Sequence, residues 1–247
     1  MSLQFAVVHE AQADFETATE LADRVLCDAI DWLDEYLLPG QRSWLGQTPG
    51  GQQLTWTAIK RLAHEENIRV RGHFDDKPAL PDAKAARRAI LYLLDKIPNL
   101  DAIVLIRDQD DQPERRDGLD QARKQDRGGI PIIVGLAVVE RESWVLCGYD
   151  PQNEAETARL MEERKRLSFD PCEKSHELTA YKKDITHRSP KRALRTLSGG
   201  DRERERRCWI EASLTVLKER GTENGLAAYL AEVHARLVPL VGRPPQP

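Results

Sequence analysis

Two apolar runs without a single charged residue constrain the fold of this 247-residue chain more than any other feature. The first covers residues 102–106 (AIVLI) and the second covers residues 130–139 (IPIIVGLAVV). Runs of this kind are typical of strands that are buried on both faces, as in parallel sheets covered by helices. A shorter run at residues 5–8 (FAVV) predicts a further strand. The three runs therefore predict a sheet in the interior of the protein.

Helical patterns separate these runs. Apolar residues recur at three- and four-residue steps from about Asp14 to Pro39-Gly40, and further helices are expected at about 56–66 and 82–96. Residues 41–55, which are rich in Gly and Gln, predict a loop, and residues 68–73 (IRVRGH) predict another strand. The alternation of strands and helices predicts an α/β fold with a mostly parallel sheet and helices on both faces.

The last third of the chain is predicted to be helical. Helices are expected from SPKRAL (189–194) onward, at 201–220 and at about 223–238. The predicted organisation is therefore an α/β catalytic domain at 1–150, a helical C-terminal region packed on it at 151–241, and a disordered tail, GRPPQP, at 242–247.

The composition favours a soluble, cytoplasmic protein without a membrane partner. Charged residues make up 32% of the chain, and no apolar run approaches the roughly 20 residues that span a bilayer. The segment MSLQFAVVHE has neither a basic region nor a small-residue cleavage site, so no signal peptide is expected. The cysteines occur singly and without the spacing of zinc ligands, so we expect them to be reduced: Cys27, Cys147, Cys172 and Cys208.

Positive charge is concentrated in one segment. Residues 182–207 hold ten Lys or Arg against four Asp or Glu, a net charge of +6, whereas the 23 basic and 33 acidic residues of 1–181 give −10. A basic segment on an acidic body indicates that a polyanion can dock there. Alternating signs, as in DRERERR, are equally typical of a solvated helix surface. Both interpretations remain open from the sequence.

Acidic residues follow the ends of the predicted strands. Glu10 comes after the first strand, Asp108 and Asp110 come after the strand at 102–106, and Glu140 and Glu142 come after the last apolar run. The carboxyl ends of parallel strands lie at one edge of a sheet, where open α/β folds form their sites. These acids are therefore expected to converge.

Converging carboxylates need a counter-charge, because they repel one another and are costly to bury unpaired. Mg²⁺ and Mn²⁺ are hard ions that favour oxygen ligands. Such an ion can hold a phosphate, generate a nucleophilic hydroxide and stabilise a leaving oxygen. The predicted chemistry is therefore a Mg²⁺ or Mn²⁺ site acting on phosphoryl or phosphodiester groups. The alternative is that these are ordinary acids between a strand and a loop.

The order of these acids resembles the TOPRIM domain of topoisomerases, primases and OLD-family nucleases. Glu10 and the Asp108-x-Asp110 pair follow strands as in that domain. In the OLD-like branch the first motif is Glu-Gly-x-x-Glu/Asp, and EAQAD matches it at Glu10 and Asp14, with Ala11 in place of the glycine. The segment ERESWVLCGYD resembles the later Glu-x-Trp-Leu-Leu segment of that branch, and the resemblance covers about residues 5–150.

The resemblance implies a Rossmann-like sheet and a metal-dependent endonuclease acting on DNA or RNA, with DNA favoured. The implied metal ligands are Glu10, Asp14, Asp108, Asp110 and either Glu140 or Glu142, and the implied catalytic residues are Glu10, Asp108, Asp110 and Glu142. Asp111 is expected to support the aspartate pair. Small proteins of this branch are often encoded beside an ATPase, so the resemblance also implies an ATPase partner and an effector role in anti-phage defence.

The basic segment is the predicted path of the nucleic-acid backbone. Its expected phosphate-binding residues are Lys182, Lys183, Arg188, Lys191, Arg192 and Arg195. Tyr181 is the aromatic residue beside them, so contact with the backbone is expected rather than base stacking.

One further motif favours a different class of protein. TLSGGDRERERR resembles the signature loop of ABC-type ATPases, but the chain has no phosphate-binding P-loop, and a helix break at Gly199-Gly200 with Asp201 as the cap of the next helix is favoured. Two alternative functions remain open: a non-catalytic subunit that binds an ATPase or nucleic acid, and a phosphatase-like enzyme acting on small nucleotides.

Overall fold

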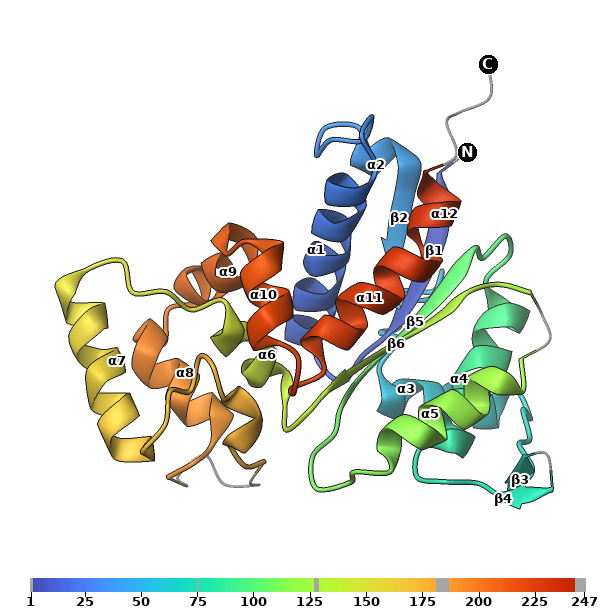
Figure 1. Ribbon diagram of the computed structural model, residues 1–247. Helices are drawn as coiled ribbons and strands as arrows, with labels where there is room; N and C mark the ends of the chain where they lie inside the picture. The colour runs from blue at the N-terminus through green and yellow to red at the C-terminus, as the bar shows by residue number, and fades with distance from the viewer. Residues whose placement is uncertain (1, 75, 127–128, 181–186, 243–247) are drawn as a thin grey trace. The chain divides into compact units, whose positions relative to one another are not determined.

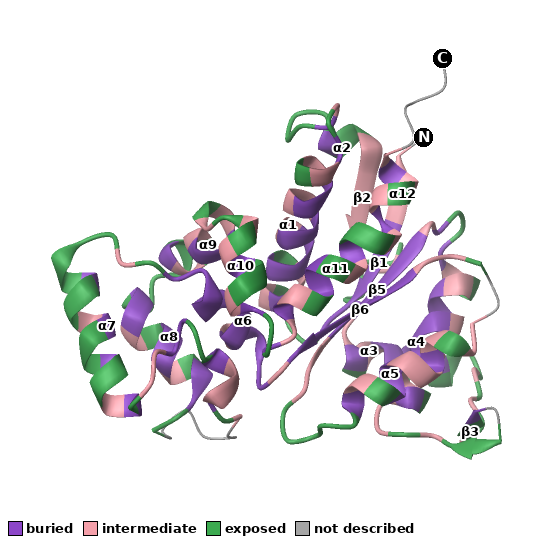
Figure 2. Ribbon diagram, viewed as in Figure 1, coloured by how far each residue is buried: buried purple, intermediate pink, exposed green. Residues whose placement is uncertain are grey.

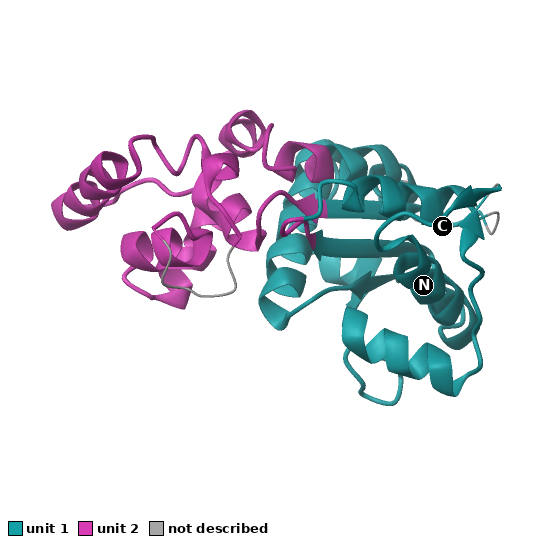
Figure 3. Ribbon diagram, turned by 90° about the horizontal axis from the view of Figure 1, so that it is seen from below, with its two compact units in different colours: residues 1–107, 112–135, 231–247 teal, residues 108–111, 136–230 magenta. Residues whose placement is uncertain are grey.

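The computed structural model describes residues 2–74, 76–126, 129–180 and 187–242. The chain divides into two compact units, coloured separately in Figure 3. Unit 1 comprises residues 1–107, 112–135 and 231–247, and unit 2 comprises residues 108–111 and 136–230.

A parallel sheet forms the centre of unit 1 (Figure 1). Its four strands stand in the order β2-β1-β5-β6, with the bounds Leu3–Val8 for β1, Arg42–Leu45 for β2, Ala102–Asp108 for β5 and Ile132–Ala137 for β6. In β1, Phe5 pairs with Trp44 on one side and with Ala102 on the other. Residues 5–8 are fully buried, because helices cover both faces of the sheet. The predicted α/β fold with a mostly parallel sheet is confirmed.

The helices of unit 1 turn apolar faces toward the sheet. One side carries α1 (Gln12–Ala29), with α12 (Val238–Val241) packed against it, and the other side carries α3 (Trp56–Glu65), α4 (Ala83–Lys96) and α5 (Arg115–Lys124). In α4 the buried residues recur at the helical period, at Ala86, Ala89, Ile90 and Leu93. Figure 2 shows these buried faces next to the buried strands.

The edge strand β2 lies within residues 41–55, where the sequence predicts a loop, so that prediction is wrong. No apolar run marks it, because all four residues are partly exposed. Side-chain contacts position it instead: the Trp44 ring lies 5.2 Å from the Phe5 ring, and Trp44 Nε1 donates to Asp23 Oδ1 of α1 at 2.9 Å. Arg42 Nε donates to the same oxygen at 2.7 Å. A short helix, α2 (Leu38–Gln41), leads into this strand.

The strand predicted at 68–73 is also wrong in the structure. Only its last residue takes part in a strand, as β3 (His73–Phe74), which pairs antiparallel with β4 (Lys77–Pro78). The Ile68 N–H instead donates to the Ala63 carbonyl at the end of α3, at 2.8 Å. Alternation of apolar and charged residues predicts a half-buried strand, but a strand also needs a neighbour for its backbone groups.

Unit 2 is helical, which confirms the prediction of a helical C-terminal region. Its elements are α6 (Arg141–Cys147), α7 (Glu154–Leu167), the 3-10 turn η1 (Ser175–Glu177), α8 (Pro190–Ser198), α9 (Arg202–Glu211), α10 (Leu214–Arg220) and the first residues of α11 (Leu226–Arg236). The helix predicted at 201–220 is interrupted, because Ser213 caps α10 by accepting from the Val216 N–H. Of the predicted tail, Gly242 ends α12, and residues 243–247 lie outside the described residues.

Asn224 joins several segments in the core of unit 2. Its carbonyl accepts from Trp144 Nε1 at 2.9 Å and from the Val138 N–H at 2.8 Å. Its side-chain amide donates to the Ser143 carbonyl and to Ser175 Oγ, both at 2.8 Å. Every partner is buried or nearly so, and a fully satisfied buried amide fixes α6 and the segment before α11 in one arrangement.

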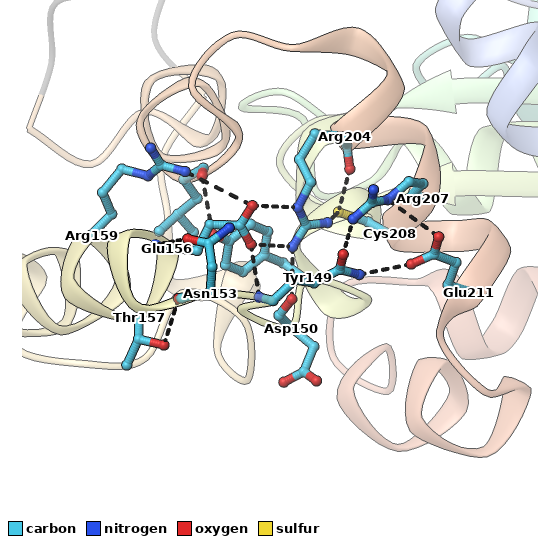
Figure 4. A network of polar contacts seen from close by, with 12 residues as sticks. Tyr149, Asp150, Asn153, Glu156, Thr157, Arg159, Arg204, Arg207, Cys208 and Glu211 are labelled. Carbon is cyan, nitrogen blue, oxygen red and sulfur yellow. Dashed lines mark hydrogen bonds and ion pairs between the residues drawn. The ribbon is translucent and has the colours of Figure 1, made fainter.

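A buried ion pair joins α7 to α9 (Figure 4). Arg204 Nε donates to Glu156 Oε1 at 3.0 Å and Arg204 Nη2 donates to Glu156 Oε2 at 2.8 Å. The guanidinium also lies 4.5 Å from the centre of the Tyr149 ring and donates to the Asp150 carbonyl. Because Arg204 donates two hydrogen bonds to it, the pKa of Glu156 is lowered to about 2. The pair therefore stays charged at neutral pH.

No helix in the described part of the chain combines the length and the apolar character that crossing a bilayer requires.

Removing the negative charge at Glu156 should destabilise the protein. Glu156→Gln leaves the Arg204 guanidinium buried without its partner, and we expect a loss of about 3 kcal/mol in the free energy of unfolding at pH 7. Since the pKa of Glu156 falls from 4.5 to about 2 on folding, the wild-type advantage is complete above pH 4.5 and disappears as the pH falls toward 2. Urea unfolding at several pH values measures the difference in the free energy of unfolding between the wild type and Glu156→Gln. Glu154→Gln, exposed in the first turn of the same helix, is the control.

Gly148 should not tolerate a side chain. A Cβ at this position would lie 1.8 Å from the Cys208 carbonyl oxygen, so Gly148→Ala must push α6 and α9 apart. We expect a loss of about 1–3 kcal/mol, measured by thermal unfolding. Gly40→Ala, where the added Cβ meets no atom within 4 Å, should leave the melting temperature unchanged. Equal melting temperatures for both variants would show that the backbones at Gly148 and Cys208 are not in close contact.

Candidate active site

Backbone hydrogen bonds join the acidic segments that follow β5 and β6. The Gln109 N–H donates to the Ala137 carbonyl at 2.8 Å, and the Asp110 N–H donates to the Val139 carbonyl at 3.1 Å. Asp108 Oδ1 accepts from the backbone N–H of Arg141 at 2.8 Å. All of these residues belong to unit 2. The backbone segments that carry Asp108, Asp110 and Glu140 therefore lie next to one another within this unit.

Two residues of these segments have left-handed backbone conformations. Asp110 has a φ of 49° and Val139 has a φ of 74°. Positive φ is rare for a β-branched side chain, and conformations of this kind cost about 1–3 kcal/mol and cluster at functional sites. The two strained residues are hydrogen-bonded to each other, and Val139 directly precedes Glu140.

Glu140 is buried and lies 3.0 Å from the ammonium of Lys191, measured from Oε1 to Nζ. Burial raises the pKa of Glu140, the ammonium of Lys191 opposes the rise, and the charges of Glu142 and Asp110 add to it. The pKa of Lys191 is raised despite its burial, by the hydrogen bond to Glu140 and by the charges of Glu142 and Asp108. Lys191 therefore lies in the field of three carboxylates, those of Glu140, Glu142 and Asp108.

Glu142 lies in the first turn of α6. Its Oε1 is 3.3 Å from Nη2 of Arg141, whose side chain is nearly buried. Both side chains act on Glu205 of α9. Burial raises the pKa of Glu205, the charge of Arg141 lowers it, and the charge of Glu142 raises it further. Arg141 thus compensates part of the negative charge that Glu142 adds to this region.

Glu10 and Asp14, the two other predicted ligands, belong to unit 1. Glu10 is exposed, and its Oε1 lies 3.1 Å from Nη1 of Arg107. Asp14 Oδ2 accepts from the Ala11 N–H at 2.7 Å and so caps α1. Ala11 has a φ of −137°, an extended conformation that any residue adopts, so this turn does not require the glycine of the OLD-like motif.

The predicted phosphate-binding residues are only partly available for a ligand. Lys182 and Lys183 lie outside the described residues. Arg192 donates from Nη1 and Nη2 to the two carboxylate oxygens of Glu163, both at 2.8 Å, and Lys191 is paired with Glu140. Arg188 lies over the Phe169 ring at 5.6 Å, and it is exposed, as is Arg195 on α8. Of the four predicted phosphate-binding residues that the structure describes, two are therefore paired with carboxylates of the chain.

In the described part of the chain, no three His, Cys, Asp or Glu side chains form a group that could hold a metal ion. The donor chemistry nevertheless fits a hard divalent cation. Carboxylate oxygens are the ligands that Mg²⁺ and Mn²⁺ favour, and the Lys191 ammonium already holds the place of a cation beside Glu140. A Mg²⁺ or Mn²⁺ ion held by Asp108, Asp110 and Glu140 therefore stays a prediction from the sequence.

Two contacts of the site were not predicted from the sequence: the pairing of Lys191 with Glu140, and the contact of Arg141 with Glu142. The basic segment predicts that Lys191 binds phosphate, but Lys191 binds Glu140, 51 positions away in the sequence. Arg141 lies in the sequence between the two predicted acids Glu140 and Glu142. That position could have indicated that Arg141 belongs to the site.

Comparison of the chain with protein-family models, with curated proteins and with solved structures found no match.

Removing the ammonium of Lys191 should make the acidic cluster sensitive to divalent cations. Without added metal, Lys191→Met should lose about 1–3 kcal/mol, because the buried Glu140 carboxylate is left without its half-exposed partner. Mg²⁺ or Mn²⁺ should then raise the melting temperature of the variant more than that of the wild type, since the ion no longer competes with the ammonium. Lys218→Met, exposed on α10, is the control. An equal change in melting temperature with metal in all three proteins would contradict the prediction that these carboxylates bind a divalent cation.

Proposed function

We propose that this chain is a divalent-metal-dependent nuclease that hydrolyses phosphodiester bonds of nucleic acid, DNA rather than RNA, at the cluster of Asp108, Asp110, Glu140 and Glu142. The observation that carries the proposal is the 3.0 Å contact between Lys191 Nζ and Glu140 Oε1 within the field of the other three acids. A buried glutamate surrounded by further carboxylates is costly, and folds retain such clusters where a cation and its chemistry are needed.

Each residue of the cluster has its own role in the proposed reaction. Asp108, Asp110 and Glu140 would hold a Mg²⁺ or Mn²⁺ ion, and a bound ion of this kind supplies an activated water and stabilises the leaving oxygen. The backbone N–H of Arg141 keeps the Asp108 carboxylate in place. Glu142 orients the attacking water. Lys191, once released from Glu140, binds a non-bridging oxygen of the scissile phosphate and stabilises the charge that develops on it.

The same proposal includes an ATPase partner and an effector role in anti-phage defence. Both are supported by the TOPRIM-like order of Glu10, Asp108-x-Asp110 and Glu142 alone. Glu10 and Asp14 stay predicted ligands on the same ground.

Neutralising Asp108 should abolish cleavage while the fold survives. Asp108→Asn keeps an oxygen that can accept from the Arg141 N–H but removes the charge that a metal ion requires. Supercoiled plasmid with Mg²⁺, Mn²⁺ or EDTA is the assay. We expect metal-dependent nicking or linearisation by the wild type and a reduction of at least about 100-fold in the variant. Asp117→Asn, exposed on α5, is the matched control. Full cleavage by Asp108→Asn would refute the site.

A second function is favoured by a different observation. Glu10 is paired with Arg107, Glu142 with Arg141 and Glu140 with Lys191, so three of the predicted ligands have a cation from the chain itself. These pairs suit a non-catalytic subunit that binds nucleic acid or an ATPase. That function predicts no cleavage with either metal and no metal-dependent rise in the melting temperature of Lys191→Met.

A further inference from the structure

Two adjoining cavities form a groove on unit 1. The first, of about 730 Å³, lies between α3, α4 and residues 79–82. The second, of about 800 Å³, continues along α3 to residues 68–70. Three residues line both cavities, namely Thr57, Lys60 and Arg88, so the two form one continuous groove, called here the α3–α4 groove.

The α3–α4 groove is strongly basic. Six cationic side chains line it, against two acidic ones, Asp82 and Glu65: Lys60, Arg61, Arg69, Lys84, Arg88 and Arg107. This excess stands within residues 1–181, whose net charge is −10 with 23 basic and 33 acidic residues. A local reversal of sign in an acidic part of the chain attracts an anionic ligand.

Several of these cations have no internal partner. Arg61 is paired with Glu65, and Arg107 contacts Glu10 and Asp82. Lys60, Lys84 and Arg88, by contrast, form no ion pair with any residue that the structure describes. Lys60 and Lys84 are exposed.

Position 72 leaves room for one of these ammonium groups. A Cβ on Gly72 would lie 3.1 Å from Nζ of Lys84, so the ammonium lies close to the backbone at this glycine.

We infer that the α3–α4 groove binds the phosphate backbone of a nucleic acid. The cations are spread along two cavities rather than gathered at one point, which suits a polymer with a repeated negative charge. The inference rests on the proposed function, since it names the surface that would hold the substrate of that nuclease. It also differs from the sequence-based expectation, because Lys191 and Arg192 of the basic segment are engaged with Glu140 and Glu163.

The groove contacts the backbone rather than the bases. Trp56 and the imidazole of His64 are the aromatic side chains in its lining, and the larger one, Trp56, is buried, with its Nε1 donating to the Ile106 carbonyl at 2.7 Å. The Arg107 guanidinium covers its ring at 5.2 Å. A ring held in this way cannot stack with a base, so binding should depend on salt and only weakly on sequence.

The experiment measures binding separately from cleavage. The affinity of a short fluorescent DNA duplex is followed by anisotropy in EDTA, at several salt concentrations, for the wild type and for Lys60→Glu, Lys84→Glu, Arg88→Glu and their combination. We expect the combined variant to bind more than tenfold more weakly at low salt. The slope of log Kd against log salt should fall by about 0.9 for each phosphate that the variant no longer neutralises. Lys124→Glu, exposed on α5, has the same charge change and should bind within twofold of the wild type.

Each outcome decides the inference. Failure of the wild type to bind DNA, or unchanged affinity in the combined variant with an unchanged melting temperature, would overturn it. So would competition by polyglutamate as strong as that by unlabelled DNA, because the groove would then select an acidic peptide. Asp108→Asn should keep full affinity in EDTA. Loss of binding in the combined variant supports the groove even if the wild type cleaves no plasmid, and in that case only the proposed function fails.

Discussion

The fold of unit 2 depends on the neutralisation of buried carboxylates by cations from α8 and α9. Glu140 is paired with Lys191, Glu163 with Arg192, and Glu156 with Arg204. All three glutamates are buried, and an ionised carboxylate without a partner in such a position costs several kcal/mol. The basic segment that stands out in the sequence is therefore in large part an internal counter-charge, which ties α8 and α9 to α6 and α7.

This role changes the interpretation of the charge distribution. From the sequence, the net charge of +6 at residues 182–207 indicates either a docking surface or a solvated helix. In the structure, Arg192 and Arg204 each make two hydrogen bonds to a single carboxylate, a geometry that a planar guanidinium suits and an ammonium does not. A second basic surface lines the α3–α4 groove, where the cations are too widely spaced in the sequence to stand out as a block.

The candidate site differs from the other ion pairs of unit 2 in one respect. Elsewhere one carboxylate faces one or two guanidinium groups, as Glu163 faces Arg192 and Arg166. At the ends of β5 and β6 several carboxylates face the single ammonium of Lys191, and the backbone at Val139 is left-handed. Backbone strain at the carboxyl ends of parallel strands is typical of functional sites rather than of purely structural segments.

Local patterns in the sequence determined the parallel sheet, the helices around it and the acids at the strand ends. The runs at 102–106 and 130–139 can be buried on both faces only in a covered sheet, and that requirement acts within a short window of the chain. Tertiary structure alone decided that residues 42–45 form the edge strand, that residues 68–71 do not form a strand, and that Lys191 binds Glu140. These features depend on which segments become neighbours in the folded chain, and the partners can be far apart in the sequence, as Lys191 and Glu140 are at 51 positions. The local sequence around one residue of such a pair does not indicate the other. A strand without a neighbour and a carboxylate without a cation are equally unfavourable, and only the folded chain selects the partners that satisfy them.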